Sequence, residues 1–269
     1  MGIGDSVKRY LAMALACAAV FPCAGGPAAA RDDKPASMRF EWRVEGPAER
    51  CGTHCRTWIS ATGVITEETA RVFEAFARSN DVRGAKLVLD SEGGSVLSAL
   101  ALGRAIRKFD MTTTVGKTTL LPAVGKNAPR AIISNSASCE SMCAFLLLAG
   151  TRRYVPAEAR VLVHQIWLGA KSKRAREVSY TADELQLVQR DIGRLTRYTA
   201  EMGGSMELIE TALRVPPWEP MHRLTGDEMR RMKVTTVDRL FEQDEAAPAV
   251  AAAPPNALTT SAQGQRKDR

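Results

Sequence analysis

The sequence predicts an α/β domain with a mainly parallel sheet and flanking helices. Strand-like runs of apolar and β-branched residues alternate along the chain with segments whose apolar residues recur at helical spacing. The clearest strand, residues 85–90, is apolar on both faces, which is typical of a parallel sheet that helices cover on either side. The chain has 269 residues, 45% of them hydrophobic, so it can bury a core of this kind.

The first half of the domain supplies the first strand–helix repeats. We expect an edge strand at residues 39–44 and a second strand at 56–60, where β-forming residues alternate. A helix begins at Thr66 with one apolar face, and another covers residues 95–109. The buried strand lies between these two helices in the chain, and this order favours parallel pairing.

The second half of the domain continues the alternation with longer helices. The helix that begins near residue 141 is apolar nearly all round, so we expect it to be buried. The expected elements in chain order are a strand at 111–115, a loop at 116–136 that includes a strand at 130–133, a helix at 141–149, strands at 153–154 and 160–164, a helix from Glu177 or Thr181 to Met202, and helices at 206–213 and 225–232.

The N-terminal residues are predicted to form a signal peptide at residues 1–30. Two basic residues precede an apolar segment at 10–21, which is too short to span a bilayer comfortably. A run of alanines ending at Ala30 offers the cleavage site, so the mature chain is expected in the periplasm or outside the cell. An uncleaved anchor is one alternative, and a lipoprotein signal at Cys17 is another.

Three regions follow the signal peptide. Residues 31–50 form a polar N-terminal extension, and residues 51–241 form the folded domain. Residues 242–269 contain too little apolar bulk to fold, so we expect a disordered Ala- and Pro-rich tail. The apolar run at 144–149 is too short to cross a membrane, so no membrane span is expected after signal removal.

Charge and aromatic content argue against a nucleic-acid partner. The formal net charge is +7, but the basic side chains are scattered along the chain. Only 6% of the residues are aromatic, whereas a nucleic-acid surface typically interleaves basic and aromatic side chains. We therefore expect no nucleic acid to bind.

Four cysteines remain in the mature chain, as the pairs Cys51/Cys55 and Cys139/Cys143. An even number in an exported chain indicates disulfides, and three connectivities are open. The two local pairs are the first choice, which requires Cys139 to precede the helix, since cysteines four apart within a regular helix have poor geometry for a bridge. A zinc site that includes His54 is the rival interpretation of the first pair, although no second zinc-type cluster is present, and no metal is expected.

Three short segments together suggest an acyl-transfer site. Ser141 precedes the buried helix, His164 ends a strand, and Gly94 belongs to a glycine turn after the strand at 85–90. A serine hydroxyl needs a nearby base such as histidine, and the attacked carbonyl oxygen needs fixed N–H donors. The N–H groups of Gly94 and Met142 are the candidate donors. The alternatives are that Ser141 only caps the helix, that His164 is a satisfied core histidine, and that the glycines only form a turn.

Four motifs, in this order and spacing, resemble those of the Clp-protease proteolytic subunit and its crotonase-like relatives. The motifs are Ser91-Glu92-Gly93-Gly94, Glu140-Ser141-Met142-Cys143-Ala144, Val163-His164-Gln165, and Leu224-Thr225-Gly226-Asp227-Glu228-Met229. The resemblance covers roughly residues 55–240 and is strongest to predicted periplasmic ClpP-like proteins. It implies a ClpP/crotonase-like fold of repeated ββα/βα units, and a serine hydrolase, a peptidase by this likeness, that acts through Ser141 and His164.

The chain departs from the family pattern at the third catalytic position. The family has an Asp there, whereas the corresponding region of this sequence has none, and Glu219 is the nearest acid with Glu210 next. Either Glu219 substitutes, a backbone carbonyl does, or the site is a weak Ser–His dyad or inactive. A Ser–Lys dyad that uses Lys117 or Lys126 is a further alternative.

The resemblance also bears on partners and cofactors. It implies a peptide or protein substrate, and the alternative is a catalytically weak or inactive scaffold that binds a peptide or protein partner in the same cleft. Proteolytic relatives form rings and crotonase relatives form trimers, so a homo-oligomer is among the expectations. No cofactor is expected, because the coenzyme A of the crotonases is intracellular.

Overall fold

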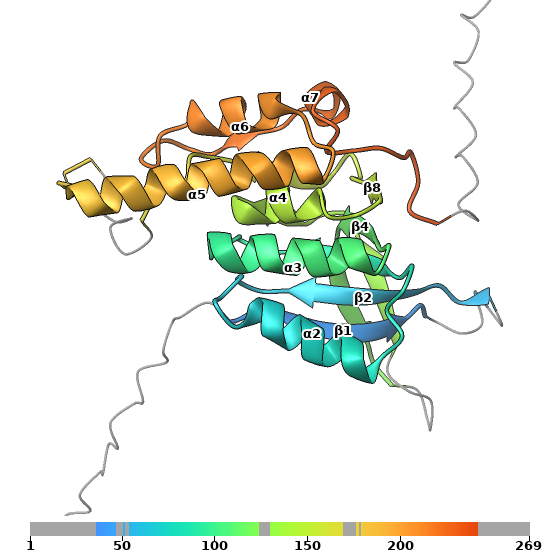
Figure 1. Ribbon diagram of the computed structural model, residues 1–269. Helices are drawn as coiled ribbons and strands as arrows, with labels where there is room; N and C mark the ends of the chain where they lie inside the picture. Colours follow the sequence, from blue (N-terminus) through green and yellow to red (C-terminus); the bar gives the residue numbers. More distant parts are fainter. Residues whose placement is uncertain are drawn as a thin grey trace, which may run out of the picture. The chain divides into compact units, whose positions relative to one another are not determined.

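Five strands form the main sheet of the computed structural model (Figure 1). The structure describes residues 36–46, 51, 54–123, 130–168, 176–177 and 179–241. In spatial order the strands are β1 (Arg39–Val44), β2 (Thr57–Thr62), β3 (Lys86–Asp90), β4 (Thr112–Val115) and β8 (Arg152–Tyr154). Only β1 is antiparallel to its neighbour, so the mainly parallel sheet is confirmed.

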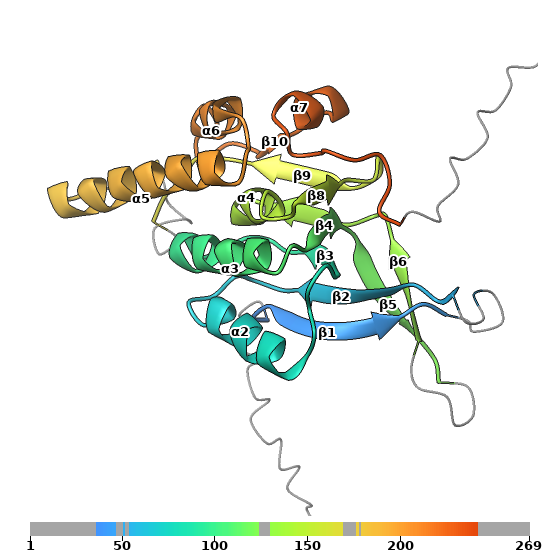
Figure 2. The same ribbon diagram turned by 45° about the vertical axis from the view of Figure 1, so that its right-hand side comes forward.

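Two helices, α2 (Thr69–Ser79) and α3 (Val96–Lys108), cover one face of this sheet (Figure 2). Phe73 of α2 is fully buried, and its ring packs edge-on against Phe40 of β1 with centroids 5.1 Å apart. The Ser95 side chain caps α3 by accepting from the Ser98 N–H at 3.4 Å. Most of the apolar positions predicted from helical spacing therefore meet the core, but Val72 and Leu97, which were predicted on the same faces, are exposed.

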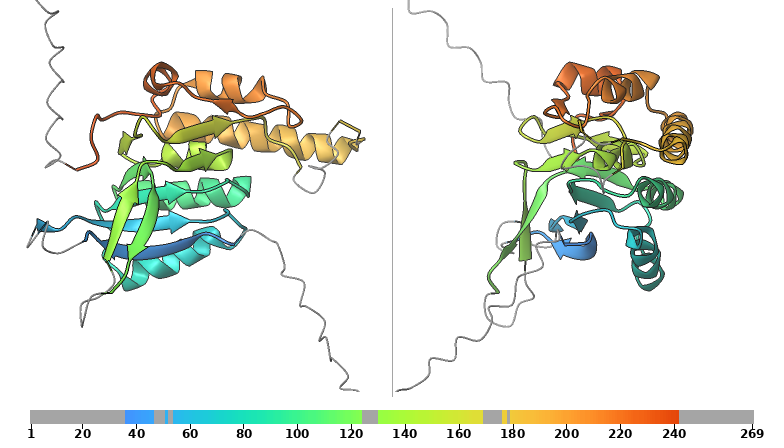
Figure 3. Two further views of the ribbon diagram at one scale, coloured as in Figure 1. Left: turned by 180° about the vertical axis from the view of Figure 1, so that it is seen from behind. Right: turned by 90° about the vertical axis from the view of Figure 1, so that its left-hand side faces the viewer.

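A hairpin packs against the opposite face of the sheet (Figure 3). It consists of β5 (Lys117–Leu121) and β6 (Arg130–Ser134), paired antiparallel. Trp58 of β2 is buried beneath it and donates its indole N–H to the Thr118 hydroxyl at 3.0 Å. The prediction of a loop at 116–136 was therefore wrong for β5. Its side chains are largely exposed, so the strand is stabilised by pairing with β6 and lacks the apolar pattern of a buried strand.

A three-stranded sheet in the order β10-β9-β7 adjoins the main sheet. Its strands are β7 (Ser138–Glu140), β9 (Arg160–Val163) and β10 (His222–Arg223). Ser91, just after β3, links the two sheets because its N–H donates to Ser138 and its carbonyl accepts from Glu140. The strands β7 and β10 were missed in the sequence, since two or three residues are too few to establish a period.

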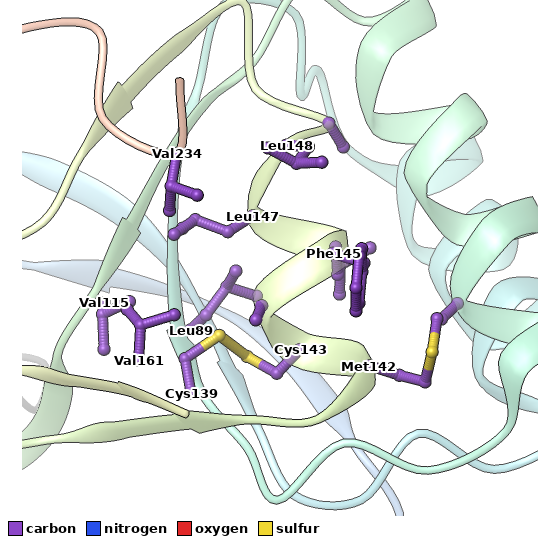
Figure 4. Close-up of a cluster of buried hydrophobic side chains, with 14 of the residues drawn as sticks. Leu89, Val115, Cys139, Met142, Cys143, Phe145, Leu147, Leu148, Val161 and Val234 are labelled. Carbon is purple, nitrogen blue, oxygen red and sulfur yellow. A yellow bond between two sulfur atoms is a disulfide. The ribbon is translucent and has the colours of Figure 1, made fainter. Parts of the chain in front are cut away.

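The remaining helices are α4 (Met142–Leu147), α5 (Ala182–Glu201), α6 (Met206–Leu213) and α7 (Gly226–Arg231). Every residue of α4 is buried, as predicted, and Figure 4 shows its side chains packed in the core. A reciprocal capping box between Thr181 and Glu184 begins α5, which decides between the two expected starts.

Several expectations lie outside the described residues. These are the signal peptide at 1–30 and the tail at 242–269, together with residues 31–35 and 47–50 of the extension. Within the described part of the chain, every helix is too short or too polar to traverse a lipid bilayer.

Candidate active site

Ser141 occupies a sharp turn between β7 and α4. Its backbone has φ 53° and ψ −120°, in a region that favours glycine, and such a conformation costs about 1–3 kcal/mol. The Ser141 N–H donates to the Leu162 carbonyl of β9 at 2.8 Å, which anchors the turn. Although Ser141 stands at the helix start, its hydroxyl makes no capping hydrogen bond. The helix-cap interpretation therefore does not describe this serine.

A disulfide closes the Ser141 turn. Cys139 of β7 is bonded to Cys143 in the first turn of α4, with Cα atoms 5.1 Å apart (Figure 4). Both cysteines are fully buried. The pairing matches the local connectivity that we expected, with Cys139 on a strand and outside the helix. The nucleophile candidate is thus enclosed in a short covalent loop.

The glycine turn after β3 packs directly against the Ser141 turn. Gly93 and Gly94 have φ values of 85° and 137°. A Cβ atom on Gly93 would lie 2.5 Å from the Glu140 carbonyl oxygen and 2.9 Å from the Met142 nitrogen. A Cβ atom on Gly94 would lie 2.1 Å from the Ile65 carbonyl oxygen. These positions need glycine for both conformation and space.

Two backbone N–H groups at the meeting of these turns are unused. The Gly93 N–H donates to the Ser91 hydroxyl at 3.1 Å. By contrast, within the described residues no acceptor is found for the N–H of Gly94 or of Met142. Free, rigidly held donors are what an oxyanion requires.

His164 follows β9 directly and is half-buried. Its ring packs edge-on against Trp167 with centroids 6.5 Å apart. Burial lowers the pKa of His164 below its ordinary value of 6.5, while the negative charge of Glu140 opposes that shift. The neutral imidazole, which is the form that accepts a proton, is therefore favoured near neutral pH.

A cavity of about 400 Å³ brings the predicted residues together. Ser141, Met142, Gly94 and His164 all line it. The remaining lining residues are largely apolar or uncharged; they are Glu92, Ser95, Val96, Phe145, Gln165, Ile166 and Trp167. One cavity with an apolar wall is therefore lined by the candidate nucleophile, by the candidate base and by the residues that carry the free N–H groups.

Other expected site residues lie elsewhere. Glu219 is exposed and does not line this cavity, and Glu210 forms a surface ion pair with Arg214. Lys117 is exposed on β5, while Lys126 lies outside the described residues. Among described atoms, no hydrogen bond joins the Ser141 hydroxyl to the His164 ring.

Three residues at or near the site were not predicted to have a role from the sequence. Glu92 and Trp167 line it, and Glu140 acts electrostatically on His164. Glu92 and Glu140 belong to the motifs named above, so their position beside the glycine turn and the serine was the available signal. Trp167 lies three residues after His164, in a loop without a periodic pattern.

The second disulfide lies away from this cavity. Cys51 is bonded to Cys55, and the Arg130 guanidinium contacts the Cys55 sulfur at 3.0 Å. Cys51 lines a different cavity. In the part of the chain that is described, no three His, Cys, Asp or Glu side chains gather as a metal site would require.

Comparison with known proteins gives a family but no individual relative. No curated protein matches the chain. The family model of the Clp protease matches residues 59–214, more than half of the chain. This segment contains Gly94, Ser141, Met142 and His164, whereas Glu219 and the Cys51–Cys55 pair lie outside it. Together with the parallel sheet and its flanking helices, the match identifies the chain as a member of the Clp protease family.

Proposed function

We propose that the protein is an exported serine peptidase in which Ser141 is the nucleophile and His164 the general base. The observation that carries the proposal is the shared cavity, which is lined by both residues and by Gly94 and Met142, whose N–H groups are free within the described residues. The apolar wall suits an extended peptide with an apolar side chain next to the scissile bond.

The proposed reaction has two halves. His164 takes the hydroxyl proton as Ser141 attacks the peptide carbonyl, and the N–H groups of Gly94 and Met142 stabilise the oxyanion. The imidazolium then gives its proton to the leaving amine, which leaves an acyl-enzyme. Water, deprotonated by His164, attacks the ester and restores the serine. The strained backbone at Ser141 supports this role, since Ser141 lines the cavity and its hydroxyl is not used to cap the helix.

The disulfides support export. Such bonds persist in oxidising compartments and are rare in the cytosol. Both cysteine pairs of the mature chain are bonded within the described residues. A mature protein that begins near Arg31 in the periplasmic fraction would agree with the proposed signal cleavage at Ala30.

A non-catalytic scaffold that binds a peptide in the same cavity is the second candidate. Two observations favour it: within the described residues the Ser141–His164 hydrogen bond is not formed, and Glu219 is remote from the cavity. Hydrogen bonds of resting active sites often close only when substrate binds, so the first observation agrees with either candidate.

Fluorophosphonate labelling of the oxidised protein separates the two. We expect a single adduct on the peptide that contains Ser141, no adduct in Ser141→Ala, and a labelling rate at least about 100-fold lower in His164→Ala. A folded wild-type protein that gives no Ser141 adduct would contradict the peptidase. Retained peptide binding by that unreactive protein would support the scaffold.

A further inference from the structure

A histidine that acts as a general base needs an acid or a carbonyl that fixes its tautomer. Glu219 is exposed, and its charge does not contribute to the pKa shift of His164. The register of the small sheet offers a different acid. The strands β7 and β9 are parallel, with Cys139 opposite Val161 and Glu140 opposite Leu162. His164 follows Leu162 by two residues along the chain and comes directly after Val163, the last residue of β9.

Side-chain alternation places Glu140 and His164 on one face of this sheet. Cys139, Val161 and Val163 are fully buried and form the core face. The residues between and after them, Glu140, Leu162 and His164, are half-buried. Because side chains alternate along a strand, the last three share the opposite face.

The separation is within reach of the two side chains. Two residues advance a strand by about 6.6 Å, and paired strands lie about 4.8 Å apart. The Ser141 N–H bond to the Leu162 carbonyl holds the two chains together at this point. Glutamate and histidine are long enough to meet across such a diagonal.

The other charged groups near His164 are directed elsewhere. His222 and Arg223 come from β10 on the other side of β9. His222 pairs with Glu228 at 3.1 Å, and the Arg223 guanidinium donates to the Ala159 carbonyl at 3.4 Å. Glu92 borders the cavity from the glycine turn.

The Glu140 carboxylate is unengaged. In the described part of the protein it has no ion pair and accepts no hydrogen bond. Among the described residues, it is also the charged group whose negative charge favours a higher pKa of His164 and so opposes the effect of burial. An anion held on the shared face, beside the imidazole, stabilises the imidazolium.

We propose that Glu140 is the positioning residue of His164 and takes the place of the family's third catalytic acid. When a substrate closes the site, its carboxylate accepts a hydrogen bond from the imidazole N–H that faces away from Ser141, and it stabilises the imidazolium formed when Ser141 is deprotonated. No proton passes to Glu140 itself. This inference rests on the proposed acyl-transfer function. The orienting acid would thus be the residue immediately before the nucleophile.

Two measurements on Glu140→Gln test the proposal, with Glu140→Asp, Glu92→Gln and Glu219→Gln as comparison variants. The first is the His164 titration followed by NMR, with the three histidines assigned through His164→Gln. The second is the rate of fluorophosphonate labelling of Ser141 as a function of pH. Circular dichroism establishes that each variant is folded.

We expect Glu140→Gln to move the His164 titration to lower pH, because the anion that favours the imidazolium is gone. The acid limb of the labelling profile should move the same way, and the maximal rate should fall about 10-fold or more, short of the roughly 10⁴-fold loss known for a fully engaged triad acid. Glu140→Asp should recover part of both effects, and Glu219→Gln should match the wild type.

Each contrary outcome has a distinct meaning. Wild-type labelling and an unchanged His164 titration in Glu140→Gln would overturn the positioning role while the peptidase stands. The positioning role would also be overturned if Glu92→Gln moves the titration and Glu140→Gln does not. A shifted titration in a protein whose Ser141 is never labelled would contradict the proposed function, and with it the catalytic part of this inference.

Discussion

The two ends of α4 are built in opposite ways. At the N-terminal end, Ser141 has a strained backbone, its hydroxyl makes no cap, and the Met142 N–H is free within the described residues. At the C-terminal end, Arg107 and Arg153 donate together to the carbonyls of Leu148 and Gly150. The N-terminal end therefore leaves polar groups without partners among the described residues, whereas at the C-terminal end each of these two carbonyls accepts hydrogen bonds from both arginines.

The N-terminal end of α4 therefore carries the candidate nucleophile, whereas the C-terminal end fixes the helix in the core. Both arginines also donate to the Met202 carbonyl at the end of α5, so they join two helix ends. Burial, and then repulsion from Arg107, lowers the pKa of Arg153 to about 10, which still leaves it charged at neutral pH. A rigid C-terminal end allows the strained turn at the other end to persist.

The largest expected effect is at the arginine end. Arg107→Met combined with Arg153→Met should lower the free energy of unfolding by about 4 kcal/mol, because the shared carbonyls lose both donors. Each single variant should cost less than half of this, since the other arginine still serves the same carbonyls. Urea denaturation measures all three, with the exposed Arg230→Met as the control.

Additive losses would show that the arginines act independently. In that case the two arginines do not substitute for each other at the C-terminal end of α4. The contrast between a rigid C-terminal end and a strained N-terminal end would then be contradicted.

An intermediate effect concerns the two disulfides, which close loops of equal length, each with a sequence separation of 4. Replacing either pair with alanine should lower the free energy of unfolding by about 2 kcal/mol, because the unfolded chain is no longer constrained by the bond.

Only the Cys139→Ala/Cys143→Ala variant should also slow Ser141 labelling, because that loop encloses the serine. Equal labelling of both double variants would show that the bridge does not hold the nucleophile turn.

The smallest effect tests strain at Ser141 directly. Ser141→Gly and Ser141→Ala both lack the hydroxyl, but glycine tolerates a φ of 53°. We expect the glycine variant to be more stable than the alanine variant by about 1 kcal/mol. Thermal denaturation at one pH measures the difference. An alanine variant of equal or greater stability would mean that the turn is not strained.

The sequence was a good guide where elements are long and buried. The run at Lys86–Asp90 and the periodic face of Val96–Lys108 predicted β3 and α3 nearly to their ends, because apolar pattern and burial agree there. The strand Lys117–Leu121 has an exposed pattern, and only its partner strand, separated by a loop, reveals it. Cross-strand pairing is not visible in a local pattern.

The same limit applies to the site. Ser141, His164 and the glycines stand in local motifs, so they could be named from the sequence. The relation of Glu140 to His164 depends on the register of β7 against β9, which no local pattern encodes. Counting along the chain led to Glu219, whose exposed loop the sequence could not place.

The edge-on contact between His164 and Trp167 makes Trp167 fluorescence a candidate probe of the cavity. A protonated imidazole quenches indole emission strongly, whereas a neutral imidazole quenches it little. Trp42 lies on β1, Trp58 is sealed beneath the hairpin and Trp218 is exposed on another loop, so none of them shares this ring contact. We therefore expect the emission of Trp167 to follow the charge state of one histidine, so that binding of a peptide or inhibitor can be detected without an attached dye.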